Sequence, residues 1–205
     1  LFLFVPQTQA ASLATLSDTM TRIKTSTASN HTMVFTTPTG VAAAQTIIVT
    51  FPDGTANGFV GASGIDYTDV DVLDDGVDLT LAGTPATTTW GAAFSGTNLN
   101  VLTITSGTGT IAASSVITIR IGTNAVIGVT GDKQITNPNT SGSKTIAITG
   151  TFTDTGNIAV PIATADQVVV SANIDPSITF TLSSTTAALG TMTTGAVAAT
   201  SAITL

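Results

Sequence analysis

The sequence predicts an all-β protein, built as an antiparallel β-sandwich of the jelly-roll or immunoglobulin-like type. Threonine makes up about a fifth of the 205 residues, and this β-branched residue with a hydroxyl suits the solvent-facing side of a strand. Apolar and polar residues alternate in several short segments, as in residues 116–121, where isoleucine occupies every second position. Turn dipeptides such as Asp75-Gly76 separate these segments, which is the pattern of many short antiparallel strands.

One short amphipathic helix is expected before the strands, over residues 12–25. Ser12 can cap its start, and Arg22 and Lys24 fall in its last turn, where the helix dipole favours cations. Large apolar residues recur along this segment at the spacing of one helical face, namely Leu13, Leu16, Met20 and Ile23. The prediction is a helix that packs across one end of the sandwich.

Strands are expected throughout the rest of the sandwich. The alternation and the turn signals place them at residues 31–36, 45–51, 65–72, 77–81, 99–105, 116–121, 144–153, 166–172 and 178–182. The chain therefore divides into an arm (residues 1–11), a sandwich domain (12–182) and a tail (183–205). The tail carries no charge and finishes in a strand-like stretch. We expect it to be either the start of a further β domain or an inter-subunit strand.

The composition argues against several classes of protein. Only 8% of the residues are charged, the net charge is −7, and all twelve acidic residues are aspartates. Nucleic-acid binding is not expected, because the five basic residues form no patch. Without cysteine the chain has no disulfide and no thiolate metal site. No apolar stretch approaches the ~20 residues of a membrane-spanning helix.

The sequence shows no recognisable catalytic machinery, and we expect the protein not to be an enzyme. His31 is the only histidine, and no pattern indicates partners for a triad or a histidine-based metal site. The motif around Ser63 lacks the spacing of a nucleophile elbow. No pair of aspartates stands out as a hydrolytic pair.

The densest charged feature lies within residues 66–78. Carboxylates this close repel one another, and a hard cation such as Ca²⁺, which takes six to eight oxygen ligands, would relieve the repulsion. No cofactor is expected other than this possible Ca²⁺. The alternative is a solvated acidic hairpin that protects a sheet edge from aggregation. The candidate ligands are Asp66, Asp69, Asp71, Asp74, Asp75 and Asp78.

Two further surface features are candidates for carbohydrate chemistry. Asn30 and Asn139 each begin an N-glycosylation pattern, although an unmodified turn is the alternative in a threonine-rich chain. Trp90 and Phe94 would support a carbohydrate-binding module if they were exposed and coplanar, and are otherwise core residues.

The first five residues form a continuous apolar run, which is the pattern of a strand buried on both faces. Such a strand can complete the open sheet of another subunit, with Pro6 ending its pairing and residues 7–11 as a linker. It can also pack back on its own domain. The run resembles the end of a signal-peptide core as well, and both interpretations favour export. The candidate donor residues are Leu1, Phe2, Leu3, Phe4 and Val5.

The apolar arm, the amphipathic segment and the cysteine-free β domain together resemble secreted fibre subunits. These are the biofilm-matrix fibre proteins of the TasA and camelysin type and the archaeal bundling pilins. The resemblance implies a jelly-roll domain that polymerises by donor-strand exchange, with residues 1–5 as the donor strand.

The expected function is therefore a subunit of an extracellular filament, a pilus or biofilm-matrix fibre, exported through a signal peptide and partnered by identical subunits head to tail. The alternatives are a surface-layer or adhesin domain that binds Ca²⁺, and a carbohydrate-binding module. An open groove lined by apolar side chains favours the fibre.

Overall fold

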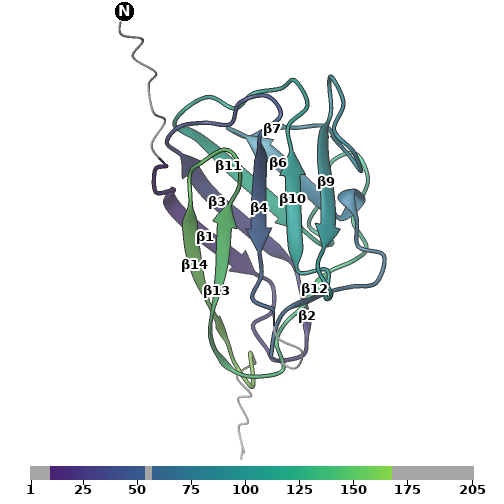
Figure 1. Cartoon of the computed structure of the whole chain (residues 1–205). Coiled ribbons are helices and arrows are strands. Elements are labelled where there is room, and N and C mark those ends of the chain that lie inside the picture. Colours follow the sequence, from purple (N-terminus) through teal and green to yellow (C-terminus); the bar gives the residue numbers. More distant parts are fainter. Residues whose placement is uncertain (1–9, 54–56, 168–205) are drawn as a thin grey trace, which may run out of the picture. The chain divides into compact units, whose positions relative to one another are not determined.

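The computed structural model describes residues 10–53 and 57–167, and these form a β-sandwich (Figure 1). The all-β prediction is confirmed for this part of the chain. Its one helical element is a single 3₁₀ turn, Tyr67–Asp69. Residues 1–9 of the predicted arm (residues 1–11) lie outside the described residues, as do the whole predicted tail (183–205) and the strand expected at residues 178–182.

Two large sheets make up the sandwich, and a small third sheet lies at one end. The first sheet has the order β1 (Ala14–Met20), β3 (His31–Thr37), β11 (Ser115–Ile121), β6 (Val70–Asp74) and β7 (Val77–Asp78). The second has the order β14 (Gly156–Ile162), β13 (Gly142–Thr149), β4 (Thr46–Thr50), β10 (Val101–Thr105), β9 (Trp90–Ser95) and β8 (Leu81–Ala82). The third joins β2 (Ala28–Ser29), β12 (Ile135–Thr136) and β5 (Val60–Gly61). All paired strands are antiparallel except β8 and β9.

Two connections run side by side where they cross from one large sheet to the other. β3 continues into β4, and β10 continues into β11, while β3 pairs with β11 and β4 with β10. The crossings themselves are joined by a bridge between Val41 and Ile111, with N···O distances of 2.9 and 2.8 Å. Gly40, at φ 79°, approaches this bridge so closely that a Cβ would clash with the Ile111 carbonyl. A bent two-stranded ribbon therefore spans both sheets.

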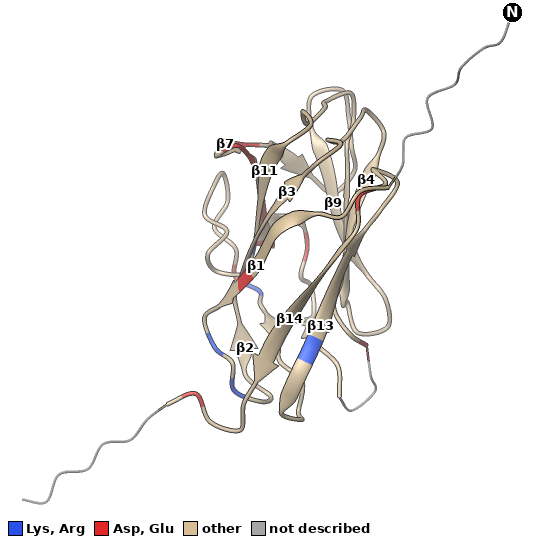
Figure 2. Cartoon of the chain, turned by 90° about the vertical axis from the view of Figure 1, so that its left-hand side faces the viewer, with Lys and Arg blue, Asp and Glu red and all other residues tan. Residues whose placement is uncertain are grey.

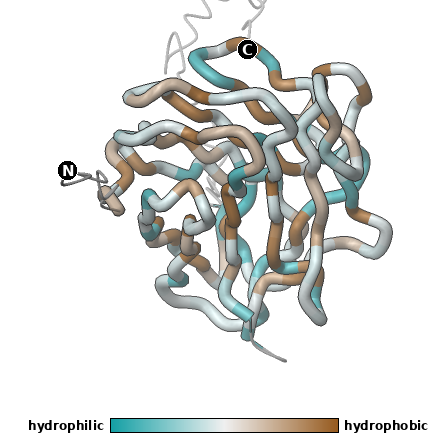
Figure 3. Tube along the Cα trace, turned by 45° about the horizontal axis from the view of Figure 1, so that its top comes forward, coloured by the Kyte–Doolittle hydropathy of each residue, from teal (hydrophilic) through white to brown (hydrophobic). Residues whose placement is uncertain are grey.

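The hydrophobic core lies between the two large sheets, and period-two alternation creates it. In β11, Ile117, Ile119 and Ile121 are fully buried while Thr118 and Arg120 are partly exposed, as the sequence predicted. Figure 3 shows hydrophobic residues recurring at intervals along the chain trace. Four phenylalanines are the largest fully buried side chains, namely Phe35, Phe51, Phe59 and Phe152.

The helix predicted for residues 12–25 is wrong, because the middle of that segment, Ala14–Met20, forms β1 and the rest is not helical. A spacing of four residues fits one face of a helix and one face of a strand equally well. In β1, Leu16, Asp18 and Met20 share a face with a period of two, and β3 supplies the hydrogen-bonding partners. A bulge at Thr15, with φ 52°, interrupts the regular pairing near the start of the strand.

Other predicted strands are shifted, divided or missed. The strand predicted at residues 65–72 is a 3₁₀ turn followed by β6, and that predicted at 77–81 is two short strands in different sheets. β9 was missed because Gly91, Ala92 and Ala93 give little strand signal. β14 was missed because Pro161 argues against a strand, although an edge strand tolerates proline. Residues 166–167 form no strand.

Within residues 10–53 and 57–167, no helix has the length and apolar character needed to cross a membrane.

Candidate functional site

The best candidate site is a groove of about 530 Å³ between two edge strands, β1 of the first sheet and β14 of the second. These strands lie side by side on the face shown in Figure 2. The groove has both apolar and polar lining residues. The large apolar ones are Leu16, Met20, Ile23, Ile158 and Val160, and the polar ones are Ser17, Asp18, Thr19 and Asn157.

Hydrogen bonds join the two edges at both ends of the groove but not along it. Ser12 pairs with Thr155 and Lys24 pairs with Ala163, each as an isolated parallel bridge. Twelve residue steps separate these bridges along the first segment, from 12 to 24, but only eight along the second, from 155 to 163. The longer segment bows away from the shorter one, and the groove occupies the space between them.

The free edge of β1 offers both backbone donors and backbone acceptors. Thr21 donates its N–H to the Asn30 carbonyl at 3.2 Å, so this pair is hydrogen-bonded between the strands. Because such pairs alternate in an antiparallel ladder, Asp18 and Met20 direct their N–H and C=O groups away from β3. These groups face the groove side of the sheet.

The free edge of β14 lacks one donor. The backbone groups of Thr155 and Ala163 hydrogen-bond to the first segment. Because backbone groups alternate in direction along a strand, every second residue between these two also points its N–H and C=O positions away from β13. These are Asn157, Ala159 and Pro161. Since proline has no N–H, Asn157 and Ala159 supply the donors of this edge, and the row of donors stops at Pro161.

A buried Asp–His pair lies beneath β1. Asp18 Oδ2 is 2.7 Å from His31 Nδ1, and both side chains are fully buried. Phe51 and Phe59, with ring centroids 5.0 and 5.9 Å away, contact the imidazole edge to face. The other polar atoms of the pair, Asp18 Oδ1 and His31 Nε2, have no hydrogen-bond partner among the described residues. Sequence reasoning missed the pair because it assigned Asp18 to a helix.

At the Ser12 end of the groove, a buried carboxylate anchors the chain where it enters the sandwich. Asp154 accepts hydrogen bonds from the Ala11 N–H at 3.3 Å and from the Thr37 hydroxyl at 2.7 Å. It also accepts from the N–H and hydroxyl of Thr39 at 3.0 and 2.8 Å. The start of the first segment is therefore held in place relative to β3 and β14.

At the Lys24 end, an ion pair joins the two segments beyond the bridge. Arg22 Nε and Nη2 donate to the two carboxylate oxygens of Asp166 at 2.5 and 3.0 Å. The hydrogen bond from Arg22 lowers the pKa of Asp166 below its usual range, against the opposing effect of burial. The pair thus stabilises the closed lower end of the groove.

Most of the carboxylates predicted to bind Ca²⁺ accept hydrogen bonds from the chain itself. Asp69 is buried and accepts the N–H groups of Asp66, Asp132 and Lys133 at 3.0, 2.8 and 2.8 Å. Asp66 in turn caps the 3₁₀ turn by accepting the Thr68 N–H at 2.8 Å. These two carboxylates fix loops by accepting backbone N–H groups.

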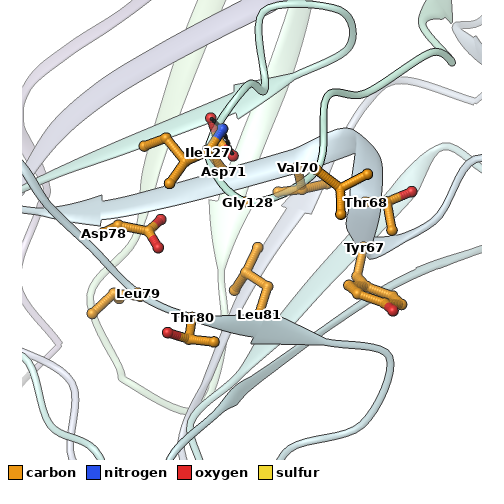
Figure 4. Close-up of a pocket in the computed structure, with 11 residues that line it drawn as sticks. Tyr67, Thr68, Val70, Asp71, Asp78, Leu79, Thr80, Leu81, Ile127 and Gly128 are labelled. Carbon is orange, nitrogen blue, oxygen red and sulfur yellow. Dashed lines mark hydrogen bonds between the residues drawn. The ribbon is translucent and has the colours of Figure 1, made fainter.

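Asp71 and Asp78 both line a pocket of about 120 Å³ (Figure 4). Asp71 is buried and accepts the N–H groups of Val126 and Ile127. Burial, and to a lesser extent the charge of Asp71, raise the pKa of Asp78. The pocket is also bordered by Tyr67, Leu81 and Ile127, so it combines two carboxylates with apolar walls.

The remaining two aspartates lie at the turn between β6 and β7. Asp75 and Gly76, at φ 48° and 84°, form the predicted turn, and Asp75 accepts the Val116 N–H at 2.8 Å. Asp74 Oδ1 is buried without a hydrogen-bond partner. Among the described residues no group of three or more His, Cys, Asp or Glu side chains is placed to hold a metal ion. Binding of Ca²⁺ by residues 66–78 stays a prediction.

The two glycosylation candidates differ in accessibility. Asn30 is buried, and its side-chain nitrogen donates to the Thr123 hydroxyl at 2.8 Å, so the folded chain does not present it to an enzyme. Asn139 is exposed in a turn before β13. Trp90 is buried in the core, which removes the aromatic platform that a carbohydrate-binding module would need there.

The comparisons with known proteins identify no family: no family model and no curated protein matches the chain. The resemblance to secreted fibre subunits therefore stays a prediction.

Proposed function

We propose that the protein is the structural subunit of an extracellular filament, a pilus or biofilm-matrix fibre, and that the groove is its acceptor site. Residues 1–5 of one copy lie in the groove of the next copy, and repetition of this contact produces a head-to-tail homopolymer. The observation that carries the proposal is the open apolar groove between the edge strands β1 and β14.

The apolar arm matches the groove in chemistry and in length. Burying five large apolar side chains contributes at most ~7–15 kcal/mol, at ~1.5–3 kcal/mol each, before the cost of ordering the arm. A five-residue strand is about 17 Å long and the seven-residue β1 about 23 Å. The arm is therefore short enough to lie along the groove, against its partly buried apolar residues.

The backbone of the groove also favours a strand as the occupant. An edge strand with free N–H and C=O groups is a template for pairing with another chain. The free edge of β1 presents such groups at Asp18 and Met20. An inserted strand would satisfy them through main-chain hydrogen bonds, while its side chains would fill the groove.

We further propose that the sandwich is of the jelly-roll type and that the chain is exported. The bent ribbon that places β3 beside β11 and β4 beside β10 supports a jelly roll. The surface rich in threonine and serine with few charges, and the signal-like arm, support an extracellular location.

The first test is negative-stain electron microscopy of the full chain beside a variant that lacks residues 1–11. We expect filaments from the full chain and monomers from the truncation. Monomers from both would overturn the proposal and favour a surface-layer or adhesin domain. Filaments from both would exclude the arm as the polymerising element.

A groove variant tests the acceptor side separately. Met20→Asp places a charge among the apolar groove residues and should abolish filaments while the purified subunit keeps its β-rich circular dichroism spectrum. Val129→Asp is the matched control, because Val129 is 59% exposed and belongs to the pocket of Figure 4, not to the groove. Equal assembly of both variants would contradict the assignment of the groove.

A Ca²⁺-binding surface-layer or adhesin domain is the second candidate, and the unpartnered Asp74 Oδ1 within the acidic segment favours it. Thermal melting of the subunit in Ca²⁺ and in EDTA tests it. A higher melting temperature in Ca²⁺, lost in Asp74→Asn, would support this candidate, whereas identical melting in both solutions would remove it.

A further inference from the structure

The two edges of the groove are unequal, and both segments that border it run in the same direction. From these features we infer that the inserted arm pairs with β1, parallel to it, and thereby extends the sheet β1-β3-β11-β6-β7 by one strand. This inference rests on the proposed function, because it specifies how the donor arm of one copy lies in the groove of the next.

The choice of edge follows from the backbone groups. Along β1, Asp18 and Met20 each present an N–H and a C=O to the open side. Along β14, Pro161 interrupts the row of donors. A strand that pairs with β1 beyond the bulge at Thr15 finds both a donor and an acceptor at Asp18 and at Met20, whereas one that pairs with β14 leaves its acceptor opposite Pro161 unsatisfied in a buried groove.

The direction follows from where the arm is attached. The arm precedes Ala10, and Ala11 lies at the Ser12–Thr155 end of the groove, where it accepts the Thr155 N–H at 3.0 Å. β1 starts at that end and runs towards the Lys24–Ala163 end. Figure 1 shows the described chain entering at one end of the sandwich and β14 finishing towards the other.

In a head-to-tail stack all copies have the same orientation, so the Ser12 end of one copy faces the Lys24 end of the next. In this arrangement the arm of one copy leaves its own Ser12 end and enters the groove of the next copy at the Lys24 end. Inside that groove the arm runs from residue 1 near Leu16 to residue 5 near Met20, in the same direction as β1. An arm that folds back into its own groove has to reverse, so it would lie antiparallel to β1.

Disulfide trapping distinguishes the two directions of the arm. Because the natural chain has no cysteine, only the introduced cysteines can form a disulfide. Leu16 and Ile23 are seven residues apart, which is about 23 Å in an extended strand, whereas a disulfide needs Cα atoms within about 7 Å. Leu1→Cys and Phe2→Cys, which cover both side-chain directions of the arm, are each combined with Leu16→Cys or with Ile23→Cys. Assembled samples are oxidised with diamide, which accepts two electrons and two protons per disulfide, and are run on non-reducing gels.

Each result has a defined meaning. A ladder of covalent multimers with Leu16→Cys and none with Ile23→Cys is the expected outcome. A ladder with Ile23→Cys alone overturns the parallel direction but leaves the filament proposal standing. A disulfide within single chains overturns both, because the arm then occupies its own groove. Filaments without any disulfide place the arm elsewhere, and they overturn both the parallel direction and the assignment of the groove as the acceptor site.

A proline variant tests the choice of edge. Ala159→Pro removes an N–H from the free side of β14 and leaves β1 unchanged, so filaments should form to the same extent as in the natural chain. Chemical unfolding of the truncated subunit that carries the same substitution reports any general loss of stability. Loss of filaments with unchanged unfolding would show that the arm pairs with β14 and would overturn the inference.

Discussion

The two lateral sides of the sandwich differ in how the gap between the sheets is covered. At the β7 and β8 side the chain itself crosses from one sheet to the other, and Leu79 and Trp90 hydrogen-bond to Val72 and Thr80 at 2.8 and 2.9 Å. At the β1 and β14 side, hydrogen bonds join the sheets only at the two ends of the groove. The β7 and β8 side is closed because the chain itself crosses there, and the β1 and β14 side is open between the two ends of the groove.

The comparison shows two uses of the same polar chemistry. At the closed side, buried carboxylates such as Asp69 and Asp71 accept backbone N–H groups and hold loops against the sheet. At the open side, Asp154 fixes only the end where the chain enters. We therefore expect loss of the buried carboxylates at the closed side to reduce stability, and substitutions along the groove to affect assembly as well.

The largest expected effect is the loss of Asp69. Asp69→Ala leaves three N–H groups at a buried site without an acceptor, so the free energy of unfolding should fall by about 3–5 kcal/mol. Urea unfolding followed by circular dichroism measures this change. Asp132→Ala is the control, since that side chain is 75% exposed and should change stability by about 0.5 kcal/mol or less. Equal effects of the two substitutions would contradict the role assigned to Asp69.

A smaller effect is expected at Gly156, where β14 begins next to β1. A Cβ at this position would clash with Leu16 Cδ2 and lie 3.1 Å from Leu13 Cβ, so Leu16 has to move towards the groove. Gly156→Ala should cost about 1 kcal/mol in urea unfolding and should slow filament growth measured by light scattering.

Gly83→Ala provides the matched control for Gly156→Ala at the closed side. Its Cβ would meet Tyr67 Cδ1 at 3.6 Å, an ordinary contact. This substitution should leave both stability and assembly nearly unchanged. If Gly83→Ala slowed filament growth more than Gly156→Ala, the groove side would not be the side on which assembly depends.

The ion pair at the lower end of the groove predicts a dependence on acid. Because Arg22 lowers the pKa of Asp166, the pair stabilises the fold above the pKa that Asp166 has in the unfolded chain, and this contribution disappears as the pH falls through the folded pKa. Arg22→Gln should therefore be less stable than the natural chain near neutral pH and equally stable in strong acid. Thermal melting over the acidic range measures the difference, and a constant difference at all pH values would contradict it.

The smallest expected effect is at Asp78, and its sign is opposite. Burial and the charge of Asp71 raise the pKa of Asp78, so the folded state disfavours the ionised carboxylate and loses stability as the pH rises through this range. Asp78→Asn should melt at a slightly higher temperature than the natural chain at neutral pH and at the same temperature in strong acid. A lower melting temperature at neutral pH would show that the ionised carboxylate is stabilising.

Local patterns predicted the parts of the fold that depend on neighbouring residues. The buried face of β11 and the turn at Asp75 and Gly76 follow from alternation and from turn chemistry. Of the groove, the sequence predicted only that an apolar acceptor would favour a fibre. The alternation of Ile158, Val160 and Ile162 was the signal for the second wall, but Pro161 masked it.

Composition and local alternation were enough to predict a chain of many short strands that carries few charges. The folded structure selected a strand for residues 14–20, because pairing with β3 distinguishes two conformations that both place Leu16 and Met20 on one face. It also decided that Asp18 meets His31, and that β1 lies beside β14, more than 130 residues away in the chain. Such long-range neighbours depend on which strand edges meet, and no local pattern of residues records that.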